Sequence, residues 1–275
     1  MSSGYIGRFA PSPSGRLHFG SIVAAIASYC DAKANDGKWL VRIEDVDGSR
    51  TVDGAANDIL RTLESYGMHW DGDVVWQNQR VHHYEEVIQD LISRGEAFDC
   101  ACTRKELAGH KLYPGYCRNG MLEGKEGRSV RFLTPVEDLV WDDLILGEQF
   151  SRGGTESDFI IKRADGYYAY HLAVVLDDAE AGMTRIVRGE DLLASTPAHL
   201  HLQHALGYKR PEYAHFGLAL NSDGSKLSKA NKAVPVEVDE APMVIAQALE
   251  FLGQKAVSLD SPENMLLQAV SNWKL

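Results

Sequence analysis

The sequence predicts an α/β fold with a parallel sheet, because short apolar runs alternate with amphipathic helical segments throughout the first hundred residues. Two of these helical segments end at a glycine, Gly67 and Gly95, as helices often do. A strand, a helix and a further strand joined in this order form a parallel sheet with a right-handed crossover. A ligand crevice would then lie at the carboxyl ends of the strands.

The first hundred residues contain three expected strands and three expected helices. The strands are short apolar runs at residues 5–9, 39–43 and 74–76. The helices are marked by apolar residues three or four positions apart, at residues 22–30, 59–66 and 84–92. We expect the first of these helices to pack against the sheet.

The pattern changes at Cys100, where the chain becomes rich in glycine, charge and turn residues as far as about residue 150. This stretch predicts an insertion. Beyond it we expect a hairpin with strands at residues 159–163 and 167–176, turned by Asp165-Gly166. Further helices are expected at residues 196–206 and 244–252.

Composition bounds the class of protein. With 275 residues, of which 44% are hydrophobic, the chain can bury an ample core, as one large domain that carries insertions. No apolar run approaches the roughly 20 residues of a membrane helix, and the N-terminus lacks a signal-peptide pattern, so a cytoplasmic location is expected. Four cysteines are too few and too clustered for a disulfide scaffold of this size. Metal binding or reduced thiols fit better, and Cys30 is assigned to the core.

The formal net charge of −11 argues against a nonspecific grip on nucleic acid, because such binding grows with the number of lysine and arginine contacts. Any RNA site must therefore be a local basic patch. Each candidate pair is more commonly ordinary surface charge. The pairs are Arg104 and Lys105, Arg128 and Arg131, Lys162 and Arg163, and Lys209 and Arg210.

Two motifs together point to chemistry at the α-phosphate of ATP. The first is LHFGS at residues 17–21, between the first expected strand and helix. There, backbone N–H groups and the His18 ring can face a phosphate, and Gly20 lets the backbone come close. The second is SKLSK at residues 225–229. Its Lys226 and Lys229 would stabilise the negative charge that grows on the phosphate oxygens as pyrophosphate leaves.

These motifs and four further segments resemble the glutamate branch of the class I aminoacyl-tRNA synthetases. The segments are GRFAPSPSG at residues 7–15, RIEDVD at 42–47, YHLAVVLDD at 170–178 and IVRGED at 186–191. The resemblance covers most of the chain and implies a Rossmann-like catalytic domain. The implied divisions are two halves of that domain at 1–99 and 151–235, a zinc-bearing insertion at 100–150 and a short helical C-terminal subdomain at 236–275.

The number of residues after the second motif narrows the resemblance. About 46 residues follow Lys229 (275 minus 229), whereas a separate domain needs about 100. The helical anticodon-binding half of a glutamyl-tRNA synthetase is therefore not expected. The chain thus resembles the shortened paralogues, the glutamyl-Q tRNA(Asp) synthetases, which glutamylate the queuosine base within the anticodon of tRNA(Asp).

The resemblance implies a glutamate site of five residues. Glutamate presents two carboxylates and one ammonium, so its site needs guanidinium forks, an acid and an orienting hydroxyl. By the resemblance, Arg8 and Arg188 bind carboxylates, Glu44 binds the α-ammonium, Tyr170 hydrogen-bonds the amino acid and Ser12 adds a contact. Glutamine would leave guanidinium charge unpaired, so we expect glutamate to be preferred.

The resemblance also implies an ATP site, in which Mg²⁺ is carried by ATP itself. The ATP-binding residues would be His18, Gly20, Ser21, Lys226 and Lys229, and His18 and the two lysines would be catalytic. Ser21 stands where the motif of the class usually ends in histidine, so a hydroxyl replaces an imidazole. Its alternative interpretation is a helix N-cap.

Three cysteines suggest a structural zinc site. Cys100, Cys102 and Cys117 offer thiolates, and tetrahedral zinc takes a fourth ligand. The resemblance implies Tyr113, four residues before Cys117, and a zinc that holds the insertion against RNA. From the residues alone His110 is favoured, because imidazole is the commoner zinc donor. Tyr116 and Asp99 also compete, and three reduced cysteines without a metal are the remaining alternative.

The expected reaction, in a monomer, forms glutamyl-adenylate from L-glutamate and ATP and then transfers glutamate to queuosine in tRNA(Asp). Within the same class, the alternative is a minimal glutamyl-tRNA synthetase that charges tRNA(Glu) with a separate anticodon-binding partner. A small-molecule nucleotidyltransferase shares the phosphate turn, but Arg8, Glu44, Tyr170 and Arg188 argue against it. A noncatalytic RNA-binding module is disfavoured because both motifs keep their cationic residues.

Overall fold

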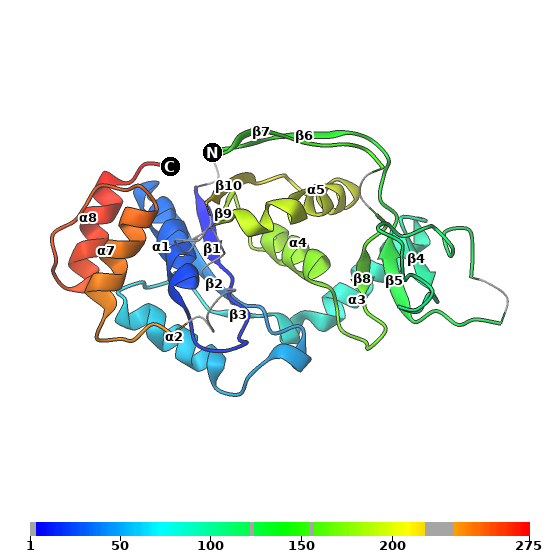
Figure 1. Cartoon of the computed structure of the whole chain (residues 1–275), viewed down its shortest axis with the longest axis horizontal. Helices are drawn as coiled ribbons and strands as arrows, with labels where there is room; N and C mark the ends of the chain where they lie inside the picture. The colour runs from blue at the N-terminus through cyan, green and yellow to red at the C-terminus, as the bar shows by residue number, and fades with distance from the viewer. Residues whose placement is uncertain (1–3, 122–123, 155–156, 218–233) are drawn as a thin grey trace.

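The computed structural model describes residues 4–121, 124–154, 157–217 and 234–275, and Figure 1 shows their arrangement. The strands are β1 (Ile6–Phe9), β2 (Lys38–Ile43), β3 (Val75–Trp76), β4 (Ala97–Cys100), β5 (Ser129–Phe132), β6 (Leu139–Asp143), β7 (Gly147–Ser151), β8 (Ile160–Lys162), β9 (Arg185–Gly189) and β10 (Glu212–Phe216). The α-helices are α1 (Phe19–Ala34), α2 (Ala55–Ser65), α3 (Val81–Ser93), α4 (Tyr170–Glu180), α5 (Thr196–Ala205), α7 (Ala241–Phe251) and α8 (Pro262–Asn272). Short 3-10 helices are η1 (Gly48–Arg50), η2 (Gln77–Arg80) and η3 (Glu190–Ser195).

The central strands are parallel, as the alternation predicts. β1 pairs in parallel with β2, and β2 with β3. β10 pairs in parallel with both β9 and β6, and β7 is antiparallel to β6. The two sheets meet where β1 lies beside β9, because Thr184 N donates to Ile6 O at 2.9 Å. The α/β class is therefore confirmed, with one antiparallel hairpin at the outer edge.

The largest core lies between these strands and helices α1, α2, α7 and α8. Trp39 on β2, Ile22 and Ile26 on α1, and Ile245 on α7 have no exposed surface. Cys30 lies in the same core, as predicted. The two C-terminal helices pack together and against α1 at one end of the molecule (Figure 1), so they support the helix that begins beside the cavity described below.

Residues 100–150, which the sequence sets apart, divide between two parts of the structure. β5 pairs antiparallel with β4 and β8, at the end of the molecule opposite α7 and α8 (Figure 1). The β6–β7 hairpin instead joins the parallel strands through β10. Residues 100–150 therefore contribute strands to two different sheets.

One predicted strand is wrong. The sequence predicts a returning strand at residues 167–176, but α4 begins at Tyr170 and continues to Glu180. All residues of the apolar run 172–176 are buried. A buried helix and a buried strand cannot be distinguished from a continuous apolar run alone. In the folded protein this run packs as a helix. Tyr170 consequently lies in the first turn of a helix.

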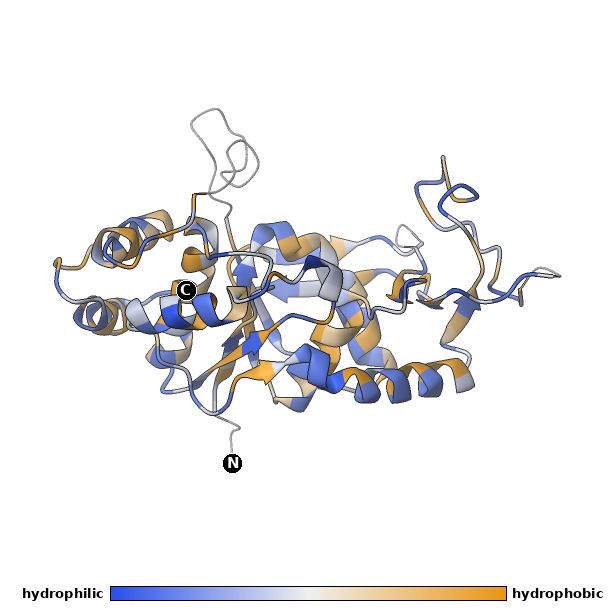
Figure 2. Ribbon diagram, turned by 90° about the horizontal axis from the view of Figure 1, so that it is seen from below, coloured by the Kyte–Doolittle hydropathy of each residue, from blue (hydrophilic) through white to orange (hydrophobic). Residues whose placement is uncertain are grey.

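The remaining helices follow the apolar spacing of the sequence. Tyr84, Ile88 and Leu91 on α3 have no exposed surface, whereas His82 on the other side of the helix is exposed. Figure 2 shows hydrophobic and hydrophilic residues mixed along the helices in the same way. Among the described residues, no helix is both long and apolar enough to span a bilayer.

Candidate active site

A cavity of about 850 Å³ opens at the carboxyl ends of β1, β2, β9 and β10. This is the edge at which the predicted fold places a ligand crevice. The cavity brings together every described residue of the predicted glutamate and ATP sites. These lining residues are Arg8, Ser12, His18, Gly20, Ser21, Glu44, Tyr170 and Arg188. Lys226 and Lys229 lie outside the described residues.

His18 is the N-cap of α1, at the turn between β1 and the helix. Its Nδ1 accepts a hydrogen bond from Ser21 N at 3.3 Å, and its Nε2 lies 3.2 Å from Ser21 Oγ. Burial lowers the pKa of His18, which favours the neutral ring at neutral pH. The interpretation of Ser21 as the N-cap is therefore wrong. The imidazole of His18 takes that role, and the Ser21 hydroxyl contacts the ring at the cavity wall.

Gly20 lies in the first turn of α1, against the His18 ring. A Cβ at this position would lie 3.4 Å from two atoms of the His18 ring. A small side chain here would therefore contact the N-cap imidazole without a clash.

Arg8 is bound bidentately by a carboxylate of the protein. Its Nε and Nη2 donate to the two oxygens of Asp178 at 3.1 and 3.2 Å. Arg42 Nη1 donates to the same carboxylate at 2.6 Å, and all three side chains are at most 5% exposed. Asp177, the neighbour of Asp178, accepts a hydrogen bond from Arg80 instead. The sequence predicts free guanidinium forks, but the fork of Arg8 is occupied, so its Nη1 is the edge that remains for a ligand.

Glu44 lies at the end of β2 beside this network. Arg42 Nη2 donates to Glu44 Oε1 at 3.2 Å, and the Glu44 side chain is 9% exposed. Burial raises the pKa of Glu44, although the charges of Arg42 and Arg8 oppose the rise. A buried acid in this state gains from a further cation, so the position suits an ammonium group.

Arg188, near the end of β9, is surrounded by neutral hydrogen-bond partners. Nε donates to His215 Nε2 at 2.9 Å, and Nη2 donates to Thr196 Oγ1 at 2.9 Å. Nη1 donates to Tyr170 Oη at the longer distance of 3.3 Å. Burial raises the pKa of Tyr170, which therefore keeps its proton. Unlike Arg8, Arg188 makes no ion pair with a carboxylate among the described residues.

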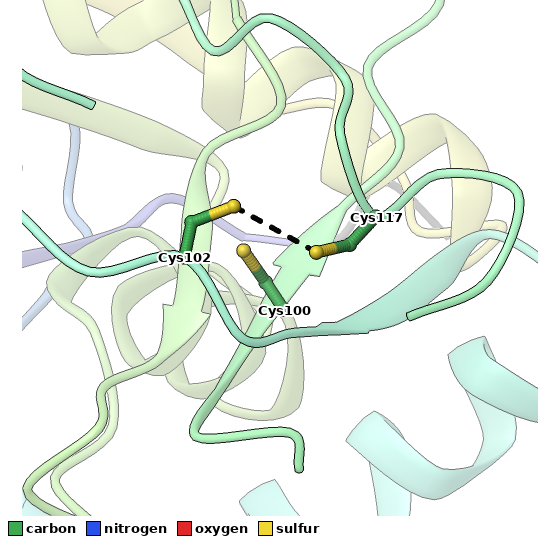
Figure 3. Close-up of side chains that lie close together, drawn as sticks. All are labelled: Cys100, Cys102 and Cys117. Carbon is green, nitrogen blue, oxygen red and sulfur yellow. Dashed lines mark hydrogen bonds between the residues drawn. The ribbon is translucent and has the colours of Figure 1, made fainter. Parts of the chain in front are cut away.

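The three predicted zinc cysteines converge (Figure 3). The Sγ atoms of Cys100, Cys102 and Cys117 lie within 4.8 Å of one another, which a single tetrahedral metal requires. Tyr113 Oη lies 3.6 Å from Cys100 Sγ and 3.8 Å from Cys102 Sγ. Of the competing ligands, His110 is exposed and its Nε2 is 3.2 Å from Tyr116 Oη, and Asp99 is exposed. Tyr113 is therefore the competitor that the fold brings to the thiols.

The charge state of the thiols also fits a cation. Burial opposes ionisation of Cys100, but its hydrogen bonds with Tyr113 and Arg131 lower its pKa to about 7. Burial and the neighbouring cysteines raise the pKa of Cys102 to about 11. These thiols would ionise together only with a compensating cation.

The predicted basic patch of Arg128 and Arg131 is wrong for Arg131, which is buried. It is 7% exposed, its Nε donates to Cys100 Sγ at 3.3 Å, and its Cζ lies 4.1 Å from the centre of the Tyr113 ring. Arg131 therefore supports the cysteine cluster and is not available as surface charge for RNA.

Three residues that hold the site together, Asp178, Arg42 and His215, were not predicted from the sequence. Asp178 and Arg42 lie within two segments that carry the resemblance, residues 170–178 and 42–47, but neither was predicted to be a site residue. The available signal was a charged residue next to an apolar run: Arg42 follows residues 39–41, and Asp178 comes shortly after residues 172–176. His215 had no local signal, because its role depends on β9 and β10 being neighbours.

The comparisons with known proteins agree with this geometry. A family model described as tRNA synthetases class I (E and Q), catalytic domain, matches residues 6–261. A relative named glutamyl-Q tRNA(Asp) synthetase from Aromatoleum aromaticum is 48% identical, over 98% of this chain and 89% of its own length. The chain belongs to the glutamyl-Q tRNA(Asp) synthetase family of class I tRNA synthetases. A second member, from Pseudomonas putida, is 47% identical over 99% of this chain and 92% of its own length.

Solved structures show the same fold. A glutamate-tRNA synthetase from Elizabethkingia anophelis superposes with a TM-score of 0.82 at 26% identity. A glutamate tRNA ligase from Elizabethkingia meningosepticum gives a TM-score of 0.80 at 24% identity. Each alignment covers 96% of this chain but only 66% and 64% of those chains. As a member of the glutamyl-Q tRNA(Asp) synthetase family, the chain is a ligase-type enzyme with a class I catalytic domain.

Proposed function

We propose that the protein activates L-glutamate with ATP and transfers it to the queuosine base in the anticodon of tRNA(Asp). The observation that carries this proposal is the identity of 46 to 48% with relatives named glutamyl-Q tRNA(Asp) synthetase, over at least 98% of the chain. The cavity supports it, because it gathers all the described residues that the resemblance assigns to glutamate and ATP.

The charges around the cavity match glutamate. Arg8 is paired with Asp178, and Arg42 with Asp178, Glu44 and Asp177, whereas Arg188 makes no ion pair among the described residues. The positive charge of Arg188 is therefore available to a substrate carboxylate, and glutamate presents two carboxylates. Glutamine is neutral overall and would leave that charge buried and unpaired, at a cost of several kcal/mol.

Each part of glutamate has a complementary group in the cavity. Glu44 takes the α-ammonium, and the Nη1 edges of Arg8 and Arg188 take the carboxylates. Tyr170 and Ser12 provide the orienting hydroxyls. Because Arg188 and Tyr170 are already in contact, they are proposed to bind one carboxylate together.

ATP is proposed to bind, with its Mg²⁺, beside His18 at the start of α1. Neutral His18, the N–H groups of the helix terminus and the Ser21 hydroxyl donate to phosphate oxygens. Lys226 and Lys229 are assigned to the α-phosphate from the sequence motif. A glutamate carboxylate oxygen attacks the α-phosphorus as the bond to pyrophosphate breaks. A queuosine hydroxyl then attacks the activated carbonyl, and AMP leaves.

The cysteine cluster is proposed to hold a structural zinc ion, with Cys100, Cys102, Tyr113 and Cys117 as ligands. When bound, zinc would cross-link the loop that follows β4 to β4 itself. Metal analysis of the purified protein tests this proposal. One equivalent of zinc supports it, and a zinc-free protein that keeps full activity after chelation contradicts it.

The tRNA acceptor is tested with labelled glutamate and three RNAs: queuosine-containing tRNA(Asp), queuosine-lacking tRNA(Asp) and tRNA(Glu). We expect label only on the first. Label on tRNA(Glu) alone would instead identify a minimal glutamyl-tRNA synthetase. We propose that the enzyme acts as a monomer, in the cytoplasm where tRNA is found.

A further inference from the structure

Three buried residues on neighbouring strands form a chain of hydrogen bonds behind the cavity. Asp143 ends β6, His215 lies on β10 and Arg188 lies on β9. Asp143 Oδ2 is 2.6 Å from His215 Nδ1, and His215 Nε2 is 2.9 Å from Arg188 Nε. The Asp143 and His215 side chains have no exposed surface. Only Arg188 of the three lines the cavity.

Asp143 is a fixed acceptor. Its Oδ1 accepts three backbone hydrogen bonds, from Ile145 N at 3.1 Å, Leu146 N at 3.0 Å and His215 N at 3.2 Å. Burial opposes ionisation, but the bonds from His215 and the backbone lower the pKa of Asp143. Because an ionised carboxylate only accepts, the hydrogen of His215 must be on Nδ1, facing Asp143.

His215 is consequently an acceptor toward Arg188. Burial and the charge of Arg188 lower the pKa of His215, although Asp143 opposes this shift. With the hydrogen on Nδ1, Nε2 presents its lone pair to the Nε–H of Arg188, which can only donate. The opposite tautomer would place two donors 2.9 Å apart.

The other hydrogen bonds of Arg188 leave one edge for a ligand. Nη2 donates to Leu192 O at 3.2 Å and to Thr196 Oγ1 at 2.9 Å. Within the part of the chain that the structure describes, the hydrogen bonds of Nη1 are both long, 3.3 Å to Tyr170 Oη and 3.4 Å to His199 Nδ1. Tyr170 lines the cavity beside Arg188, so Nη1 is the edge that faces a substrate.

We propose that Asp143 and His215 are positioning residues for glutamate binding. Asp143 fixes the tautomer of His215, and His215 in turn accepts from Nε of Arg188. The Nη1 edge of Arg188 is thereby directed to a substrate carboxylate. His215 also separates Arg188 from the Asp143 charge. Arg8 is neutralised by direct contact with Asp178, whereas Arg188 keeps its charge for the ligand. This inference rests on the proposed function, because it assumes that the cavity binds glutamate.

Three variants separate positioning from bulk packing. In His215→Asn the side-chain amide can still bond Asp143 but no longer reaches Arg188. In His215→Gln the longer side chain can place its oxygen near the former Nε2 and accept from Arg188 Nε. In Asp143→Asn the amide oxygen keeps the backbone donors and the NH₂ group faces His215, which forces the hydrogen onto Nε2. His201→Asn is the matched control, because His201 is a buried histidine on α5 with 7% exposure and is not in this chain of bonds.

Glutamate-dependent pyrophosphate exchange gives KM for glutamate and for ATP separately. We expect His215→Asn and Asp143→Asn to raise KM for glutamate about tenfold or more, as the loss of a hydrogen bond to a charged group predicts. KM for ATP should stay within about twofold, a split that misfolding would not produce. His215→Gln should recover most of the affinity, and His201→Asn should match the wild type.

An unchanged KM for glutamate in Asp143→Asn overturns the proposal, as does an equal rise in both KM values. If His215→Asn does not fold, Asp143→Asn and His215→Gln decide the question by the same criteria. A wild-type protein without glutamate-dependent exchange refutes the proposed function and this inference together. If the wild type shows glutamate-dependent exchange and the variants keep the wild-type KM for glutamate, the inference alone is refuted.

Discussion

Replacing Asp178 with asparagine should strongly destabilise the protein. Asp178 is 4% exposed and accepts hydrogen bonds from two buried guanidinium groups, those of Arg8 and Arg42. Asparagine has nearly the same shape, so no cavity forms. Its NH₂ group, however, would face guanidinium donors, and the negative charge between them would be lost.

The magnitude follows from the burial of all three partners. Removing one partner of a buried ion pair costs about 3 to 5 kcal/mol, because an uncompensated charge stays in the interior. The other contacts of Arg42, to Glu44 at 3.2 Å and to Asp177 at 3.7 Å, reduce this cost, so we expect about 3 kcal/mol. Such a loss is a large part of the roughly 5 to 15 kcal/mol by which native proteins are stable.

Urea unfolding at pH 7, followed by circular dichroism, measures the effect as the free energy of unfolding. The matched control is Asp90→Asn, which removes an exposed ion pair between Asp90 on α3 and Arg94 just beyond the helix, and should cost less than about 0.5 kcal/mol. Asp178→Asn within about 1 kcal/mol of the wild type would refute the reasoning.

The pH dependence adds a check. Burial opposes the shift, but Arg42 and Arg8 lower the pKa of Asp178 below its usual 3.8. A carboxyl with a depressed folded-state pKa contributes stability that is present above the unfolded value and lost as the pH falls through the folded value. The difference between the wild type and Asp178→Asn should therefore stay constant from pH 5 to pH 8 and shrink below the pKa of the unfolded carboxyl.

Three further predictions concern the metal, the histidines and the lysines. Cys117→Ser should abolish the proposed zinc binding and lower the melting temperature, and retention of a full equivalent of metal would contradict its role as a ligand. Burial lowers the pKa of His199 well below 6.5, so as the pH falls the histidine is protonated in the unfolded state before it is protonated in the folded state. The free energy of unfolding should therefore fall below pH 6.5, by up to about 1.4 kcal/mol per pH unit. His199→Gln should flatten this slope in urea unfolding at pH 7 and pH 5, and an equal slope would count against the buried neutral ring. Lys226→Ala and Lys229→Ala should each lower kcat of pyrophosphate exchange by about 10² or more without changing glutamate affinity in calorimetry, and unchanged kcat would remove them from catalysis.

The elements near the N-terminus could be predicted because their signals are local. The helix that became α1 shows apolar spacing from Ile22 to Cys30, and His18 stands at the strand-to-helix turn before it. The α4 helix could not be predicted, since its apolar run has no alternation to mark the period. Likewise, only the fold shows that the Arg8 fork is occupied, because Asp178 lies 170 residues away in the sequence.

The sequence by itself determined the family, the α/β class and the residues that gather at the cavity, because each motif combines the residue types that its chemistry needs within a few positions. The tertiary structure decided how those residues are held: Tyr113 beside the cysteines, Asp178 between two arginines, and His215 between Asp143 and Arg188. These contacts join segments far apart in the chain. Whether a buried charge is neutralised or left free for a ligand depends on distances that no local pattern specifies.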